Sequence, residues 1–157
     1  MILIIGYGNP LRSDDAIGQQ IAQTMQDRLG RSDVEVQLVY QLTPELVESV
    51  SHACLVVFID ARVGDKPGEV IHETLEPRSI AGAFTHNVTP MSLLSAAHDL
   101  YGALPDGILI SIAGAGFDYG CELSPQLQNL LPLITDEVKT IIESSVNVHI
   151  YEETHYA

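Results

Sequence analysis

The chain has 157 residues, 46% of them hydrophobic and 18% charged, so it can bury one sizeable core without disulfides or structural metals. Seven Lys and Arg against 21 Asp and Glu give a formal net charge of -14, which repels nucleic-acid phosphates and anionic membrane surfaces at long range. We therefore expect a single domain over residues 1–157, with no nucleic acid and no membrane among its partners.

The cysteines and the N-terminus indicate a cytoplasmic protein. Cys54 and Cys121 have no C-x-x-C spacing and no secretory context, which favours reduced thiols. The apolar residues 1–5 have no basic leader and are too few for a signal-peptide core or a membrane span. Asp, Glu, Gly or Pro interrupts every later apolar run before it could span a bilayer.

The first part of the chain alternates predicted strands and helices. Residues 2–5 predict a strand. Apolar residues at helical spacing over 17–29 predict a helix that ends at Gly30. Residues 34–40 predict a second strand. Thr43 and Pro44 then supply an N-cap and a first-turn proline for a short helix to residue 50.

The middle of the chain continues this alternation. The unbroken apolar run 54–59 ends in Asp60, which is typical of a strand buried on both faces of a mostly parallel sheet. Residues 69–75 alternate apolar and polar side chains after a turn, which predicts an antiparallel edge strand. Residues 76–88 lack periodicity and predict a loop, and loops of this length often carry function.

The last part adds two helices and a strand. The pair Thr89-Pro90 predicts a helix to residue 100, and residues 108–113 predict a strand. The pair Ser124-Pro125 starts a final helix with one apolar stripe, which Pro132 is expected to bend; the stripe comprises Leu127, Leu130, Leu131, Ile134, Val138 and Ile141. Residues 146–157 predict an acidic tail of uncertain order. The whole pattern predicts one α/β domain.

The segment after the first strand contains Gly6-Tyr7-Gly8, which could begin a dinucleotide-binding fingerprint. Leu11 stands where G-x-G-x-x-G needs its third glycine, and the second strand ends without a ribose-binding carboxylate. A tight strand-to-helix turn explains these glycines better than nucleotide binding does.

Carboxylates and one histidine form the candidate site. Asp14 and Asp15 open the first helix, where acids also favour the helix dipole. Their loop lies at the carboxyl edge of the predicted sheet, where such folds bind ligands. Asp60 is expected at the same edge, although a solvated loop acid is an equal alternative. Converging carboxylates favour a cation or a shared proton, and His86 could complete an Asp15, Asp60 and His86 ligand set.

Other catalytic patterns are absent from the sequence. It has no G-x-S-x-G elbow, no H-E-x-x-H helix and no P-loop, and neither cysteine adjoins an activating motif. Taken alone, a histidine such as His86 is more often a plain loop histidine than a metal ligand. The other five histidines show no metal-ligand spacing and carry no assignment; they are His52, His72, His98, His149 and His155.

Three segments together resemble the hydrogenase maturation endopeptidases. Residues 6–18, Gly-Tyr-Gly-Asn-Pro-Leu-Arg-Ser-Asp-Asp-Ala-Ile-Gly, are similar to the family's G-x-G-N-x-L-x-x-D-[DE]-x-x-G opening. Residues 59–61 resemble its second acidic segment. Residues 86–94 resemble its third, in which a histidine precedes an apolar helix. The segments occur in the family's order, and the resemblance covers residues 1 to about 145.

The resemblance implies a fold and an activity. The fold is a three-layer αβα arrangement, a twisted, mostly parallel sheet with helices on both faces. The activity is that of an aspartyl-type endopeptidase that removes the C-terminal extension of an immature [NiFe]-hydrogenase large subunit. The resemblance also assigns Asp15, Asp60 and His86 to nickel that the precursor supplies, with no permanent cofactor. Whether nickel is a recognition element or also activates water or the scissile carbonyl stays open.

Two departures bear on the subgroup. Ala16 replaces a frequent glycine, and residues 41–46, Gln-Leu-Thr-Pro-Glu-Leu, replace a Gly-Gly-Thr segment of some members. The latter variant resembles members that serve bidirectional, pyridine-nucleotide-linked hydrogenases. The alternative function, from a different class, is a non-catalytic metal- or nucleotide-sensing module, because a fold does not fix a function.

Overall fold

The computed structural model describes residues 1–76 and 87–156, and its elements alternate as the α/β pattern predicts. The strands are β1 (Ile2–Tyr7), β2 (Val34–Val39), β3 (Leu55–Val63), β4 (Val70–Leu75) and β5 (Asp106–Gly114). The α-helices are α1 (Ile17–Arg28), α2 (Val47–His52), α3 (Pro90–Tyr101) and α4 (Pro125–Tyr156). Short 3-10 helices, η1 (Ser13–Ala16) and η2 (Pro44–Leu46), precede α1 and α2.

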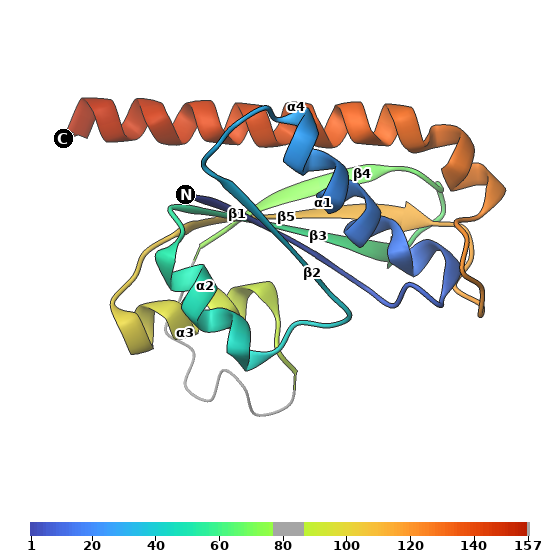
Figure 1. Ribbon diagram of the computed structural model, residues 1–157, viewed down its shortest axis with the longest axis horizontal. Helices are drawn as coiled ribbons and strands as arrows, with labels where there is room; N and C mark the ends of the chain where they lie inside the picture. Colours follow the sequence, from blue (N-terminus) through green and yellow to red (C-terminus); the bar gives the residue numbers. More distant parts are fainter. Residues whose placement is uncertain (77–86, 157) are drawn as a thin grey trace.

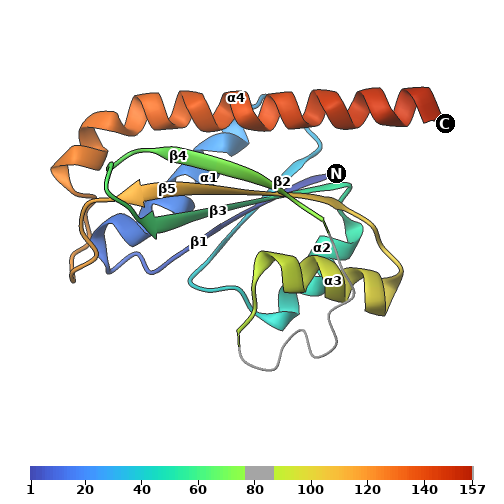
Figure 2. The same ribbon diagram turned by 180° about the vertical axis from the view of Figure 1, so that it is seen from behind.

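The strands form one sheet in the order β2-β1-β3-β5-β4. The first four are parallel, and β4 pairs antiparallel with β5 at one edge, as its alternating sequence predicts. Helices α1 and α4 lie against one face and α2 and α3 against the other (Figures 1 and 2). This confirms the predicted three-layer arrangement.

Alternating side chains of the central strands supply both halves of the core. In β1, Ile2 and Ile4 pack with α1 and α4, whereas Leu3 and Ile5 pack with α2 and α3. Strand β3 divides its apolar residues in the same way, which explains its unbroken apolar run. Within the described residues, no helix is long and apolar enough to cross a bilayer.

The helix α3 begins as its sequence predicts. The Thr89 hydroxyl accepts a 3.1 Å hydrogen bond from the Ser92 backbone N–H, and the Ser92 hydroxyl accepts one of 2.7 Å from the Thr89 N–H. This reciprocal cap fixes the first turn of α3. Thr43 lacks such a bond, and the helix predicted after it begins as the 3-10 turn η2.

The chain end differs from the prediction. Residues 146–156 continue α4 as a helix instead of forming a tail of uncertain order. Val146 is buried at the end of an i, i+4 series, and His149 ties the next turn to the sheet. Ile142, not Ile141, is the fully buried member of the stripe at that turn. The first turns of α4 are inclined to the rest in Figure 1, as expected of a helix that contains Pro132.

Candidate functional site

The loop between β1 and α1 fixes the Asp15 side chain. The Asn9 backbone N–H donates a 2.6 Å hydrogen bond to Asp15 Oδ2, and the Asn9 side chain accepts one of 2.9 Å from the Leu11 N–H. Gly8 has φ +145°, and a Cβ there would lie 2.0 Å from the Asp15 carbonyl oxygen. The side chain of Gln19 holds the outer side of the turn by donating to the Gly8 and Val39 carbonyls. The loop therefore presents Asp15 in one defined position.

Glycines bring α1 close enough to the sheet for this geometry. A Cβ on Gly18 would lie 2.4 Å from the Ile59 carbonyl oxygen and 2.9 Å from that of Tyr7. A Cβ on Gly6 would lie 2.5 Å from both the Ala22 side chain and the Gly18 carbonyl. These glycines allow close packing at a tight strand-to-helix turn. This agrees with the sequence, in which the dinucleotide-binding fingerprint is incomplete.

Asp14, the other acid of the pair, is a buried structural residue with 0% exposure. Its Oδ2 accepts hydrogen bonds from the Ala115 and Gly116 N–H groups at 2.7 and 3.0 Å, and its Oδ1 accepts one of 2.7 Å from the Ser124 N–H. Desolvation acts to raise the pKa of Asp14, but hydrogen bonds from Ser124, Ala115 and Gly116 outweigh it and lower that pKa. Asp14 therefore anchors residues 115–124 beneath the site loop.

A second contact joins the same two segments and was not expected from the sequence. Arg12 and Gly120 form an isolated parallel bridge, in which the Ser13 N–H donates to the Gly120 carbonyl and the Gly120 N–H donates to the Leu11 carbonyl, each at 2.9 Å. The Arg12 guanidinium lies 5.0 Å from the centre of the Tyr119 ring. The three glycines of residues 114–120 were the only sequence signal for this irregular segment.

Asp60 lies inside β3, not at its end as predicted. Strand β1 pairs with β3 only as far as Gly6 opposite Ile59, while β5 pairs with β3 up to Val63 opposite Gly114. Strand β3 therefore continues beyond Ile59 because its backbone still pairs with β5. Asp60 is the first residue of β3 beyond the β1 pairing, so the carboxylate still reaches the carboxyl edge of the sheet.

The carboxylates of Asp15 and Asp60 are close enough to interact. Desolvation raises the pKa of Asp60 to about 6. Hydrogen bonds from the Tyr7 hydroxyl and the Ala61 N–H oppose this shift, and the negative charge of Asp15 adds to it. The structure therefore brings together two of the three predicted site residues at one edge.

His86 lies outside the described residues, so its predicted place at the site stays a prediction. Val88, two residues later, packs with Tyr7 against the same core cluster. Among the residues that the structure describes, no three His, Cys, Asp or Glu side chains are grouped to hold a metal ion. Two mutually repelling carboxylates, one with a raised pKa, are nevertheless a pair that a cation or a proton would stabilise.

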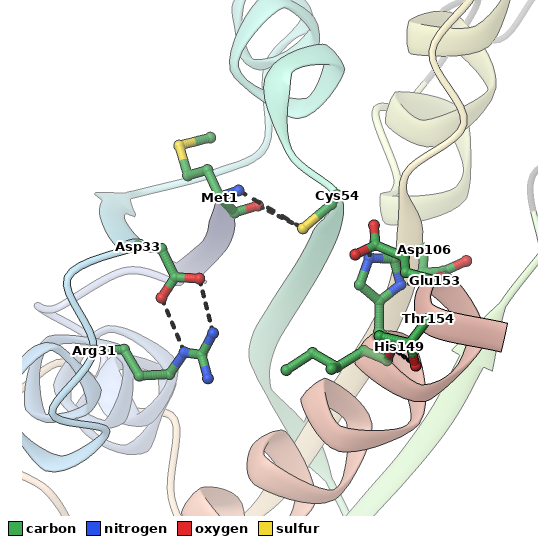
Figure 3. A network of polar contacts seen from close by, with 9 residues as sticks. Met1, Arg31, Asp33, Cys54, Asp106, His149, Glu153 and Thr154 are labelled. Atoms are coloured by element: carbon green, nitrogen blue, oxygen red, sulfur yellow. Dashed lines mark hydrogen bonds and ion pairs between the residues drawn. The ribbon is translucent and has the colours of Figure 1, made fainter. Parts of the chain in front are cut away.

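A separate polar cluster lies at the opposite, amino-terminal edge of the sheet (Figure 3). His149 of α4 has Nδ1 2.7 Å from Asp106 Oδ2 and Nε2 3.2 Å from Glu153 Oε1. Nearby, the Cys54 thiol donates a 3.1 Å hydrogen bond to the Met1 carbonyl. A cavity of about 280 Å³ between these groups is away from both site carboxylates. The contact between His149 and Asp106 joins α4 to the sheet.

Solved structures of hydrogenase maturation proteases share this architecture. The hydrogenase maturating endopeptidase HybD of E. coli superposes with a TM-score of 0.69 at 21% identity, over 92% of this chain and 93% of that one. The maturation protease HycI of Thermococcus kodakarensis gives 0.68 at 24% identity, over 90% and 92%. The hydrogenase 2 maturation peptidase of a Thaumarchaeota archaeon gives 0.66 at 20%, over 93% and 97%.

No protein-family model and no curated protein matches the sequence. The structural likeness extends over nearly the full length of both chains in each comparison. The chain therefore has the fold of the hydrogenase maturation proteases.

Proposed function

We propose that the chain is an endopeptidase that removes the C-terminal extension of a nickel-loaded [NiFe]-hydrogenase large-subunit precursor. Two observations support this function: the three motif segments of the sequence, and the fold shared with structures named as hydrogenase maturation proteases. The observation that carries it is the approach of Asp15 and Asp60 at the carboxyl edge of the sheet.

The proposed site uses nickel as a feature of the substrate. Asp15 and Asp60 supply carboxylate oxygens from two different elements, and His86 adds an imidazole from the loop before α3. Borderline divalent ions such as nickel accept this mixture of oxygen and nitrogen ligands. A metal already held in the precursor would bring the scissile bond to the two carboxylates, so the enzyme itself needs no permanent cofactor.

The electrostatics of the pair favour such a partner. In the enzyme alone, Asp15 and Asp60 repel each other, and burial disfavours the charged form of Asp60. A divalent cation between them would remove both penalties at once. The two carboxylates are therefore more stable with a cation between them than without one. A cation that arrives with the substrate would supply this stabilisation.

The immediate partner in this proposal is the immature large subunit, and we place the reaction in the cytoplasm. Both cysteines are free thiols, with Cys54 partly exposed and Cys121 exposed, as expected in a reducing compartment. Residues 41–46 further suggest a precursor of the bidirectional, pyridine-nucleotide-linked hydrogenase class.

The test is incubation of the purified protein with a nickel-loaded large-subunit precursor, followed by intact-mass measurement of the precursor. A mass loss equal to one C-terminal peptide is expected, with the peptide recovered as a second product. An unchanged mass across precursors of several hydrogenase classes would instead favour the non-catalytic metal- or nucleotide-sensing module.

A further inference from the structure

Two loops beyond the carboxyl ends of the strands form one continuous surface next to Asp15. The loop between β1 and α1 and the loop between β5 and α4 lie side by side there (Figure 1). The Ser13 hydroxyl donates a 2.8 Å hydrogen bond to the Asp118 carbonyl, in addition to the two backbone bonds at Gly120. The Asp15 N–H donates to the Arg12 carbonyl at 3.1 Å, so this surface is continuous with the candidate site.

Each loop exposes a large apolar side chain. Leu11 is 60% exposed and Tyr119 is 83% exposed, so neither contributes much to the core. Single exposed apolar residues are common on proteins. Here, however, hydrogen bonds from Asn9 and Gly120 hold the Leu11 backbone, and the same bridge ties down the segment that contains Tyr119. Side chains on an ordered backbone lose less conformational entropy when they bind a partner.

Arg12 joins these two side chains and has no acidic partner. It follows Leu11, and its guanidinium lies 5.0 Å from the centre of the Tyr119 ring. It forms no ion pair with any residue that the structure describes, although the formal net charge is -14. Four other cationic residues do form ion pairs with carboxylates; they are Arg28, Arg31, Arg62 and Lys139.

The stacked arrangement leaves Arg12 available to a ligand. A guanidinium over an aromatic ring keeps its N–H donors free at its edge, and their fork geometry matches a carboxylate. Tyrosine and arginine are also the residues most often responsible for binding energy at protein interfaces. The surface therefore offers an apolar contact on either side of a cation, and the described part of the chain supplies no carboxylate to that cation.

We propose that Leu11, Arg12 and Tyr119 form a docking surface for the precursor, which binds an apolar segment that carries an adjacent carboxylate. This inference rests on the proposed function and adds a contact outside the three proposed nickel ligands. Because the docking surface is continuous with the Asp15 loop, a precursor bound there would have its metal beside the site carboxylates. A second copy of the chain is a poorer occupant, since it would bring another net charge of -14.

The test compares two docking variants with two matched controls. Tyr119→Ala removes the ring, and Arg12→Gln removes the charge. The controls are Tyr101→Ala, at the exposed end of α3, and Arg28→Gln, in an exposed ion pair at the end of α1. With nickel-loaded precursor, each docking variant should raise KM about 10-fold while kcat stays within about twofold. The controls should match the wild type, and all four should keep the wild-type melting temperature.

The charge of Arg12 can be tested separately from its size. Arg12→Glu should raise KM more than Arg12→Gln does, because it would repel the carboxylate that we propose in the precursor. The difference in KM between wild type and Arg12→Gln should also shrink as salt is raised from about 0.05 to about 0.5 M, since salt screens exposed charges. Equal KM values for Arg12→Gln and Arg12→Glu would contradict a carboxylate in the bound segment.

A binding measurement does not depend on cleavage. In the Asp60→Ala background, which is expected to leave the precursor intact, Tyr119→Ala and Arg12→Gln should weaken the Kd for nickel-loaded precursor about 10-fold. Unchanged KM and Kd in both variants, or an enzyme whose self-association is lost in Tyr119→Ala, would overturn the docking surface. If wild-type protein fails to process the precursor, the proposed function fails, whereas a cleaving wild type with unaffected docking variants refutes only this inference.

Discussion

Asp14 Oδ1 accepts a 2.7 Å hydrogen bond from the backbone N–H of Ser124, which lies 110 residues later in the chain. Two further N–H groups of the same segment donate to the other oxygen of this buried carboxylate. Asp15, the next residue, instead accepts a hydrogen bond from the Asn9 N–H, and its charge raises the pKa of Asp60. Asp14 thus holds the backbone of residues 115–124 in place, whereas Asp15 supplies a carboxylate of the candidate site.

Replacing Asp14 by Asn should therefore destabilise the fold. The amide would place an N–H₂ group against backbone donors and remove the negative charge, which should lower the free energy of unfolding by roughly 2–4 kcal/mol. Asp15→Asn is the matched control. It removes the charge of a carboxylate that accepts one backbone hydrogen bond, and it should lower the free energy of unfolding by less than about 1 kcal/mol. Urea unfolding at pH 7 measures both, and equal losses would contradict the structural role of Asp14.

The same variant should show a defined pH dependence. Because the pKa of Asp14 is lowered in the folded state, its stabilisation is present above the unfolded pKa of about 4 and is lost as pH falls through the folded value. The difference in unfolding free energy between wild type and Asp14→Asn should thus narrow below about pH 4. A difference that stays constant down to pH 2 would mean that the carboxylate charge is not what stabilises the fold.

Asp60→Asn should have the opposite effect on stability and abolish processing. Since the folded pKa of Asp60 is raised to about 6, its ionisation costs stability progressively as pH rises from the unfolded pKa of about 4, and the full cost is present above pH 6. The stability that the variant gains over wild type should therefore be near zero at pH 4 and reach roughly 1–3 kcal/mol by pH 8. Asp60→Ala should likewise fold and fail to cleave.

Denaturation at several pH values and intact-mass assays with precursor would be run on the same preparations. An Asp60 variant that unfolds at pH 8 would show that this carboxylate supports the fold. A variant that folds and cleaves at the wild-type rate would remove Asp60 from the proposed site.

Nickel should be needed in the precursor and not in the enzyme. The proposed ligands are two carboxylates, Asp15 and Asp60, and the imidazole of His86, with no thiolate and without the helical spacing of a built-in zinc site. Purified enzyme should carry little metal, and enzyme treated with a chelator that is then removed should stay active. Precursor prepared without nickel should stay uncut, and its cleavage at the loaded rate would refute nickel recognition.

Gly18→Ala should move α1 away from the strand ends. The new Cβ would meet two backbone carbonyls, at 2.4 and 2.9 Å, and neither can rotate away. We expect a loss of about 1–3 kcal/mol in the free energy of unfolding. Processing should also slow, because Asp15 moves with the start of the helix. Gly116→Ala, where a Cβ meets nothing within 4 Å, is the control and should retain near-wild-type stability and activity.

The sequence predicted the strands well because burial on both faces requires unbroken apolar runs such as 54–59. It could not separate Asp14 from Asp15, since both suit a helix start and only the distant segment 115–124 distinguishes them. The sequence wrongly placed Asp60 at a strand end. The apolar run stops at residue 59, but β3 continues because its backbone still pairs with β5, and this pairing cannot be read from the sequence of β3. Buried apolar residues at i, i+4 spacing up to Val146 are consistent with a longer α4. The acidic, polar composition after Val146 instead favoured a tail of uncertain order.

The length and direction of α4 have a practical consequence. Its last turns run past the amino-terminal edge of the sheet, so the final residues leave the domain at the end opposite to Asp15 and Asp60 (Figure 1). A purification tag, a fluorophore or a surface tether joined there would stand clear of a precursor bound at the proposed site. Immobilised enzyme attached through this helix should therefore capture and release precursor freely, whereas attachment through the Leu11 or Tyr119 loops would place the support across the site.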